Sequence, residues 1–380
     1  MKKMSDIDKK YAKAVNVLNK AGQFPIPASD TTISILKLTI KEEDLDFIMA
    51  FKRKVSQTME QLKESSKLSE EEILTKVKRL AEKGVMFDQP NRHGVMIFRL
   101  LPIIRQFEYN FMKKLEHNEE NKELGRLFKD FNNNMGQLFQ NDYDNFLGMW
   151  KKMPPLDRTV PYVKNQDGDN IEIVLDKEVE VPIEKIIPTQ NIDDIVKKFD
   201  DIAVGKCFCR QHEDILGHPC EQIELVDSCF TLGKSARHTS KHGFSRLVSQ
   251  EEALNILKTC REAGLVHKAY HLASDINKEE VAICNCCGDG CCPNSLKGAF
   301  IPQNNAASFV AEINPELCTG CGMCVEKCHN AIIELNDDDK AERDEEFCIG
   351  CGVCAYFCPE NAIALVEKKR TVNIIPPRKN

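Results

Sequence analysis

Two stretches of the chain repeat one cysteine pattern at an offset of 30 positions. Residues 316–328 read ELCTGCGMCVEKC, and residues 346–358 read EFCIGCGVCAYFC. Both stretches spell C-x2-C-x2-C-x3-C, and both continue into Asn-Ala-Ile. Glycines separate the first three cysteines in each copy, at Gly320, Gly322, Gly350 and Gly352. Eight cysteines in a duplicated spacing indicate a pair of equivalent metal-binding loops.

The spacing has a physical reason. Three cysteines at intervals of three wrap a loop around a cubane cluster, while the fourth cysteine leaves on the next helix and points at the other cluster. Glycines let the backbone approach the sulfides closely enough for amides to donate hydrogen bonds. We therefore predict two 4Fe-4S clusters rather than zinc or a lone structural cluster. The predicted ligand sets are Cys318, Cys321, Cys324 and Cys358 for the first cluster, and Cys348, Cys351, Cys354 and Cys328 for the second.

This repeat resembles a bacterial two-cluster ferredoxin over about 60 residues. The resemblance implies that the segment carries electrons. One position departs from the usual pattern, because His329 follows the fourth cysteine of the first copy where proline is common, whereas Pro359 keeps the proline in the second copy. Cys328 is present, so ligation is expected to survive while the local turn and the potential differ.

Ten further cysteines lie between residues 205 and 300, and none precedes Cys207. One is Cys260, alone on a predicted helix over Ser249–Ala263, where we expect a buried apolar side chain rather than a ligand. The other nine fall into two groups along the chain. These are Cys207, Cys209, Cys220 and Cys229, followed by Cys284, Cys286, Cys287, Cys291 and Cys292.

These nine thiols predict at least one metal centre beyond the repeat. Closely packed thiols oxidise or repel one another as thiolates unless a cation holds them, and soft thiolates favour iron or zinc. Adjacent cysteines point in different directions, so one site cannot use all five members of the second group. The spacing C-x-C-x10-C-x8-C matches no standard pattern, which leaves an iron–sulfur cluster, structural zinc or redox-active thiols and disulfides open.

Other polar residues near these groups are not expected to bind metal. We expect four flanking histidines to be surface or hydrogen-bonded side chains rather than ligands, namely His212, His218, His267 and His271. Arg210 directly follows Cys-x-Cys. Its guanidinium could compensate an anionic cluster or could equally face solvent.

The whole chain resembles a poorly characterised group of prokaryotic, mostly anaerobic iron–sulfur proteins. The residues that carry the likeness are Ala203–Arg210, Ser249–His267 and Ile283–Cys292. In that group, C-x-C-R and C-N-C-C segments precede a two-cluster ferredoxin domain. The second segment is usually richer in cysteine, whereas here Asp289 and Gly290 intervene. The resemblance implies electron transfer and names no substrate.

The N-terminal part predicts a winged-helix-like module over residues 30–105. Three short helices are expected at Glu42–Lys52, Ser56–Ser66 and Ser69–Lys83, the last opened by a capping box between Ser69 and Glu72. Two strands follow at Val85–Phe87 and Val95–Leu101. The third helix would read DNA, but it mixes acidic and basic residues, and duplex binding rests on net positive charge. We therefore do not expect DNA to be a partner.

The predicted architecture is an α+β multidomain protein. Residues 106–152 have helical spacing, Val160–Val181 alternates like a hairpin and Ile192–Phe199 suits a helix. The predicted divisions are an N-terminal helical segment (1–29), the winged-helix-like module (30–105), a helical region with a linker hairpin (106–200), a cysteine-rich domain (201–304), a dicluster 4Fe-4S ferredoxin-like domain (305–370) and a tail (371–380).

Composition and charge agree with a soluble electron-transfer protein. Of the 380 residues, 42% are hydrophobic and 29% are charged, an ordinary globular balance. No run approaches the roughly 18–20 apolar residues that cross a bilayer, and no signal peptide is visible. We expect a cytoplasmic protein. Residues 311–370 hold 13 acidic and 6 basic residues. Their net charge of −7 equals that of the whole chain.

These features favour an electron carrier, or the electron-transfer subunit of an oxidoreductase complex, over an enzyme that acts alone. An acidic surface suits docking to a basic patch on a redox partner, such as a flavoprotein or another oxidoreductase subunit. No G-x-G-x-x-G or P-loop pattern supports a nucleotide cofactor. Two other functions stay open, a redox-sensing winged-helix transcription regulator and an oxidoreductase whose active centre is the cysteine-rich middle region.

Overall fold

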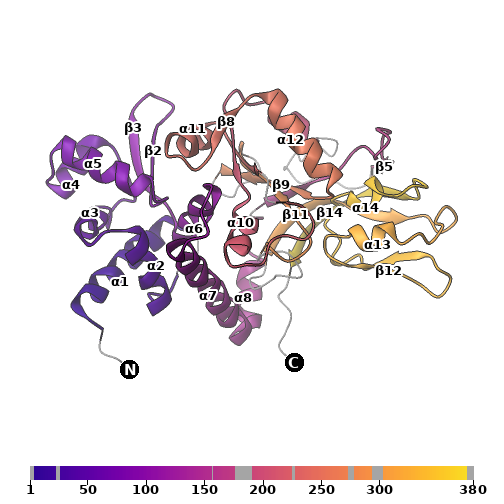
Figure 1. The fold of residues 1–380 in the computed structure, drawn as a ribbon, viewed down its shortest axis with the longest axis horizontal. Helices are drawn as coiled ribbons and strands as arrows, with labels where there is room; N and C mark the ends of the chain where they lie inside the picture. Colours follow the sequence, from indigo (N-terminus) through magenta and orange to yellow (C-terminus); the bar gives the residue numbers. More distant parts are fainter. Residues whose placement is uncertain are drawn as a thin grey trace.

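The computed structural model describes residues 4–22, 26–155, 157–175, 191–224, 227–272, 278–292 and 303–374. Figure 1 shows three parts in a row: N-terminal helices at one end, a large sheet with flanking helices in the middle, and the cysteine repeat at the other end. No helix among these residues is long and apolar enough to cross a bilayer.

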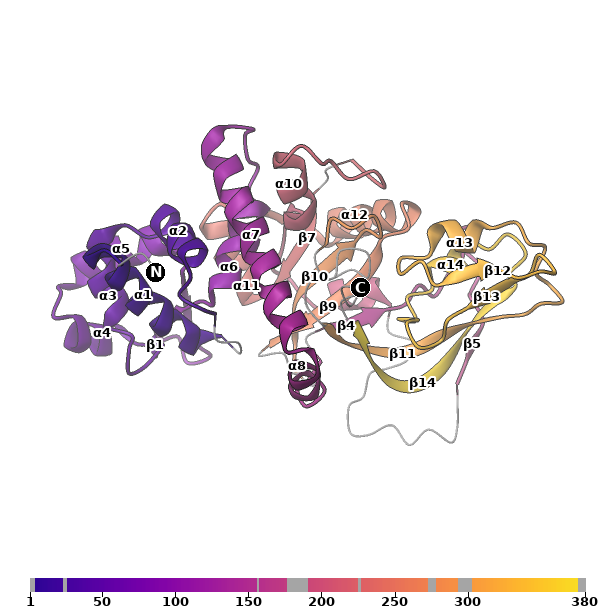
Figure 2. The ribbon, with the colours of Figure 1, turned by 90° about the horizontal axis from the view of Figure 1, so that it is seen from below.

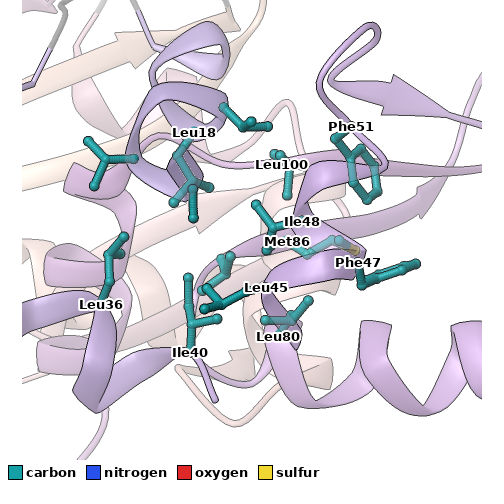
Figure 3. Close-up of a cluster of buried hydrophobic side chains, with 14 of the residues drawn as sticks. Leu18, Leu36, Ile40, Leu45, Phe47, Ile48, Phe51, Leu80, Met86 and Leu100 are labelled. Carbon is teal, nitrogen blue, oxygen red and sulfur yellow. The ribbon is translucent and has the colours of Figure 1, made fainter. Parts of the chain in front are cut away.

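The N-terminal part combines helices with a small antiparallel sheet. Its helices are α1 (Asp6–Leu18), α2 (Asp30–Thr39), α3 (Leu45–Met49), α4 (Met59–Ser66) and α5 (Glu70–Ala81). Its sheet has the order β1-β3-β2 and consists of β1 (Ser56–Gln57), β2 (Met86–Pro90) and β3 (Met96–Leu100). Leu18, Leu36, Ile48, Met86 and Leu100 from these elements share one buried core (Figure 3).

Most predicted elements of this part are present, and the winged-helix assignment itself stays a prediction. The capping box is confirmed, because Ser69 accepts from the Glu72 amide and the Glu72 carboxylate accepts from the Ser69 amide. The helix expected at Glu42–Lys52 instead begins with a 3-10 turn over Glu42–Asp44 and ends at Met49. The fully buried Asp44 carboxylate at this turn binds the side chains of two residues of α5, Lys76 and Arg79.

The predicted helical region over residues 106–152 is confirmed. It comprises α6 (Ile103–Met112), α7 (Glu119–Asn141) and α8 (Tyr143–Trp150). Phe107, Phe111 and Phe128 pack their rings together in a buried cluster between α6 and α7. Phe208 of the following cysteine-rich region packs against the same cluster. The helical region therefore joins the N-terminal part to the middle of the molecule.

One sheet of nine strands runs through the rest of the chain, in the order β5-β14-β11-β4-β9-β10-β7-β6-β8. These strands are β4 (Asp157–Val160), β5 (Ile173–Val174), β6 (Ile202–Lys206), β7 (Asp227–Leu232), β8 (Arg246–Val248), β9 (Val266–His271), β10 (Glu280–Cys286), β11 (Gln303–Ile313) and β14 (Ile363–Ile374). The helices on this part are α9 (Ile192–Val196), α10 (Phe208–Ile215), α11 (Lys234–Lys241) and α12 (Gln250–Glu262).

The linker hairpin predicted at Val160–Val181 stays a prediction, and within the described residues of this range Lys164 and Asn170 form an antiparallel bridge. Ile173 pairs in parallel with Leu365 of β14, far along the chain, and β4 pairs with β9 and β11. Val179 and Val181 lie outside the described residues. Alternating apolar residues indicate a strand but do not name its partner, and the partner of β5 comes from the C-terminal region.

The sheet also crosses the domain boundary predicted between residues 304 and 305. β11 pairs with β14 on one side and with β4 on the other, and Figure 2 shows these two long strands running from the middle towards the repeat. β14 continues to Ile374, into the segment predicted as a tail. Phe309 and Leu365 are buried with Tyr162 in one core. The cysteine-rich region and the repeat are therefore joined by a common sheet.

Candidate metal centres

The first predicted set of four thiols surrounds one cavity. Cys318, Cys321 and Cys324 line it from the first loop, and Cys358 lines it from the second copy of the repeat. Cys324 lies in the first turn of α13 (Met323–Lys327). Burial, together with the neighbouring thiols, raises the pKa of Cys324 to about 11. Crowded thiols resist ionisation in this way until a cation compensates their charge.

The second predicted set also comes together. Cys348, Cys351 and Cys354 of the second loop lie close to Cys328 of the first copy, near enough to influence one another's ionisation. Cys354 lies on α14 (Val353–Tyr356). Burial raises the pKa of Cys351 to about 12. The fourth cysteine of each copy thus lies with the other copy's loop, as the spacing predicts, while the ligand roles themselves stay predictions.

Glycine in the two loops is required by close backbone approach at Gly320 and Gly350. A Cβ atom on Gly320 would lie 2.3 Å from the Asp339 carbonyl oxygen, and one on Gly350 would lie 2.0 Å from the Phe309 carbonyl oxygen. Both residues have φ values in the left-handed region, at 73° and 62°. The contacts place the first loop against the turn between β12 (Ile333–Leu335) and β13 (Ala341–Arg343), and the second loop against β11.

The two thiol sets differ in exposure. Cys321 is exposed, whereas Cys348 and Cys354 are both buried. The second set also faces the middle of the molecule, where the Tyr162 amide donates to the Cys351 carbonyl oxygen at 3.0 Å. The first set lies near the surface instead.

Tyr162, which binds the backbone of Cys351, and Gly288, which lies against His329, connect the repeat to the cysteine-rich region. The buried Tyr162 hydroxyl donates to the carbonyl oxygen of Leu265, and its ring lies 5.0 Å from that of His267. A Cβ atom on Gly288 would lie 3.1 Å from the Cα atom of His329. The residue that replaces proline after Cys328 therefore packs against the middle cysteine loop.

Four side chains of the cysteine-rich region form what we call the compact group. Its ligand atoms all lie within 4.8 Å of one another, and its members are Cys220, Cys287, Asp289 and Cys291. Asp289 accepts hydrogen bonds from the amides of Cys291 and Glu221, both at 3.1 Å, which hold its carboxylate in place. Hydrogen bonds from Cys287 and Cys291 hold the pKa of Cys220 well below its usual range.

The remaining thiols form a second cluster, the open group. Its members are Cys207, Cys209, Cys229, Cys284, Cys286 and Cys292, supplied by the ends of β6 and α10, by β7, by β10 and by the loop after β10. Hydrogen-bonding contacts link Cys209 to both Cys207 and Cys292, Cys286 to Cys292, and Cys284 to Cys229. The hydrogen bond with Cys209 lowers the pKa of Cys207 to about 6.

The structure therefore regroups the two sequence clusters. Cys220 belongs to the first group along the sequence but lies beside Cys287 and Cys291 of the second group, because the chain before β7 approaches the loop after β10. The prediction that adjacent cysteines diverge is confirmed, since Cys286 contacts Cys292 while Cys287 contacts Cys220. Cys260 is fully buried beside Cys287 and Leu265, as predicted for an apolar side chain.

Arg210 is buried between the two groups, which rules out the solvent-facing alternative. Its guanidinium is fully buried and donates to the Asn285 carbonyl oxygen at 3.1 Å and to the Ser228 hydroxyl. The thiols of Cys207, Cys287 and Cys220 hold its pKa above the usual value despite burial. A buried arginine compensates thiolate charge in the interior.

Two further polar residues of these sites had no clear signal in the sequence. Lys268 is buried, pairs with Asp157 at 3.3 Å, and is close enough to Cys286 and Cys292 for their charge to raise its pKa. Asp289 was visible only as an interruption of the cysteine run. A lysine such as Lys268 within a buried strand is informative only once its cross-strand neighbour, Cys284, is known.

The four flanking histidines are surface or hydrogen-bonded side chains, as predicted. His218 is exposed. His212 lies 2.9 Å from the carbonyl oxygen of Gly125, and His267 lies 2.6 Å from the Asn285 side-chain oxygen. His271 lies 2.7 Å from the carbonyl oxygen of Lys278.

Comparison with known proteins identifies the repeat. Residues 317–363 match the family model of the 4Fe-4S dicluster domain. A probable ferredoxin from Methanosarcina thermophila is 60% identical to this chain over 30 residues, which are 8% of this chain and 52% of the relative. The chain thus spans about half the length of that curated relative. No solved structure matches the chain. The chain contains a ferredoxin-type 4Fe-4S dicluster domain, and iron–sulfur chemistry of this type serves electron transfer.

Proposed function

We propose that this chain is an electron carrier, or the electron-transfer subunit of an oxidoreductase complex, with two 4Fe-4S clusters in its C-terminal repeat. One observation carries the proposal: within the matched dicluster domain, each fourth cysteine lies with the other copy's loop. Cys318, Cys321, Cys324 and Cys358 would hold the first cluster, and Cys348, Cys351, Cys354 and Cys328 the second. Such clusters supply one-electron redox chemistry when bound.

The protein's own residues support this role by giving the two sites different surroundings. The exposed Cys321 opens the first site to a partner at the surface. Tyr162 connects the second site to the cysteine-rich region through its backbone contact with Cys351 and its ring contact with His267. Electrons would enter or leave at the repeat and exchange with the middle of the molecule.

We further propose that the cysteine-rich region holds metal in both of its groups. In a tetrahedral zinc site with Zn–S bonds of about 2.3 Å, the ligand atoms are about 3.8 Å apart. The compact group, with three thiols and a carboxylate within 4.8 Å, suits such a single ion. The open group brings six thiols from four segments against two buried cations, Arg210 and Lys268. An anionic iron–sulfur cluster suits that setting.

The proposed partner is a redox protein with a basic docking surface, such as a flavoprotein or another oxidoreductase subunit, in the cytoplasm. Residues Asp337, Asp338 and Asp339 are exposed at the turn whose backbone touches Gly320 of the first thiol loop. Acidic residues around an electron exit site attract a basic partner and speed its encounter.

The alternative of a DNA-binding redox regulator has weaker support. Two of the basic side chains on α5, Lys76 and Arg79, bind the buried carboxylate of Asp44 and are not available to phosphates.

An oxidoreductase with its active centre in the cysteine-rich region differs from a carrier in one measurable way. The isolated chain would then turn over a small substrate with an artificial electron donor.

Metal and sulfide analysis of the full chain, purified without oxygen, tests the proposal. We expect more than about eight irons per chain, matched by acid-labile sulfide, because the repeat alone accounts for about eight. Cys321→Ala should remove or convert one cluster and leave the other spectroscopically intact. Cys260→Ala, at a buried cysteine outside both groups, is the matched control and should leave the iron content unchanged. Fewer than about eight irons in the unmodified chain would contradict the two-cluster assignment.

A further inference from the structure

A further cluster of ligand-type side chains lies between the N-terminal part and the large sheet. Asp88 of β2 lies against His238, which is in α11, and against His242, which is the C-cap residue of α11. All three side chains are buried, with exposed fractions of 5%, 0% and 8%. Their ligand atoms lie within 4.8 Å of one another.

The three side chains converge on one point. Asp88 Oδ1 lies 3.2 Å from His238 Nδ1 and 2.6 Å from His242 Nε2. Two imidazoles therefore face the same carboxylate oxygen. Two histidines four residues apart on a helix present their rings on one face, which is the spacing that helical metal sites use. Two histidines and one carboxylate are a ligand set that leaves further coordination positions open.

The surroundings resemble those that orient ligands in metal sites. Lys241 binds the other carboxylate oxygen, Asp88 Oδ2, at 2.6 Å, and so fixes the carboxylate without occupying Oδ1. Apolar rings enclose His238, with the Phe87 ring 4.6 Å and the Tyr109 ring 5.9 Å from its own.

A purely hydrogen-bonded cluster leaves this arrangement incomplete. His238 Nδ1 and His242 Nε2 share one acceptor oxygen, so a cation between them would satisfy three ligands at once. A neutral hydrogen-bond network would normally distribute its donors over more acceptors.

We propose that Asp88, His238 and His242 bind one divalent first-row transition-metal ion, such as Zn²⁺ or Fe²⁺, through two imidazoles and one carboxylate. The ion links the β2–β3 hairpin of the N-terminal part to α11 on the large sheet. The signal in the sequence is the pair His238-x3-His242, but Asp88 lies 150 positions before His238, so only the tertiary structure completes the site. This site contains no thiol and is independent of the proposed electron-transfer function.

Cobalt is a suitable probe because its absorption edge is distinct from that of the iron in the other centres. The full chain, purified without oxygen, would be loaded with Co²⁺ and dialysed, and its cobalt would be counted and examined by X-ray absorption. We expect a component with only nitrogen and oxygen ligands, at the roughly 2.0–2.2 Å typical of imidazole and carboxylate. His242→Ala should remove that component and lower the bound cobalt by about one ion per chain.

Three further variants make the test decisive. His218→Ala removes an exposed histidine and should leave the nitrogen and oxygen component unchanged. Asp88→Asn keeps the shape and a hydrogen-bonding oxygen, so it should fold even if His242→Ala does not, and it should weaken Co²⁺ binding at this site at least tenfold. Lys241→Met breaks the ion pair but should retain the cobalt. Equal cobalt spectra for the unmodified chain and Asp88→Asn would overturn the proposal.

Discussion

The ferredoxin-type repeat and the cysteine-rich region both gather thiols, but they assemble them by different routes. In the repeat, three thiols of each set come from one continuous loop, and the fourth comes from the other copy. In the compact group, Cys220 precedes β7, whereas Cys287 and Cys291 follow β10. The first kind of site is encoded by local spacing, whereas the second exists only after distant strands have paired.

The largest expected effect tests the exchange of fourth ligands within the repeat. Cys358→Ala should perturb the site near the surface, and Cys328→Ala should perturb the buried site beside Tyr162. Each change should lower the iron content by up to about four atoms per chain, or convert one cluster to a three-iron form. Electron paramagnetic resonance of the reduced protein distinguishes the two sites. If Cys358→Ala altered the same signal as Cys351→Ala, the exchange would be wrong.

A second prediction contrasts two neighbouring residues of the middle region. Cys286 belongs to the open group and Cys287 to the compact group. Cys286→Ala should lower iron and sulfide beyond the repeat, whereas Cys287→Ala should lower a single bound ion, such as zinc, by about one equivalent. Elemental analysis after anaerobic purification measures both losses. Identical losses in the two variants would mean that the region holds one centre.

A third prediction concerns the buried charge between the two groups. Arg210→Met removes the guanidinium that donates to Asn285 and Ser228, and it leaves nearby thiolates without compensation. Removing one partner of a buried ionic arrangement costs about 3–5 kcal/mol, so we expect a large fall in the free energy of unfolding and loss of metal from this region. Urea unfolding of the metal-loaded protein measures the effect.

Arg246→Met is the matched control for Arg210→Met. The Arg246 side chain is about half exposed and pairs with Glu252 at 2.6 Å on the surface. Exposed ion pairs contribute about 0–1 kcal/mol. Equal losses of stability for the two arginine variants would show that Arg210 is not a compensating charge.

A fourth prediction tests the close backbone contact in the second loop of the repeat. Gly350→Ala would place a Cβ atom 2.0 Å from the Phe309 carbonyl oxygen at a φ of 62°. The left-handed conformation alone costs a non-glycine residue about 1–2 kcal/mol, so we expect a total loss above about 2 kcal/mol in the free energy of unfolding. Gly148→Ala, in α8, would place its Cβ atom in open space with no neighbour within 4 Å, and it should instead be neutral or slightly stabilising.

The smallest expected effect concerns the acidic surface of the repeat. Electron transfer between the chain and a basic redox partner should slow as salt rises, because the Debye length falls from about 10 Å at 0.1 M to about 3 Å at 1 M. Replacing Asp337 and Asp338 with Asn should reduce this dependence without changing the iron content. Stopped-flow rates over a salt series measure it. A rate that is independent of ionic strength would remove the argument for electrostatic docking.

The shared sheet limits how the two regions can be separated. A truncation near residue 304 would remove most of β11 and all of β14, and so strip β4 and Tyr162 of their neighbours. Loss of metal from such a fragment would then reflect loss of structure. Single-residue variants of the full chain are therefore the appropriate comparison.

The sequence alone determined the features that depend on local spacing. The duplicated C-x2-C-x2-C-x3-C pattern predicted which four thiols would lie together at each repeat site, and Ser69 with Glu72 predicted the start of α5. Helical periodicity likewise located α6 and α7. Such features rest on contacts within one turn or one loop, so the order of residues is enough to define them.

The tertiary structure decided everything that depends on pairing between distant segments. It paired β5 with β14, joined Cys220 to Cys287 and buried Arg210 between the two groups. It also brought Asp88 to α11. Strand pairing and the burial of charge depend on which surfaces meet, and the hydrophobic pattern of a strand specifies its face but not its partner. Residue spacing therefore predicted the ferredoxin-type sites, whereas the middle sites and the histidine site required the fold.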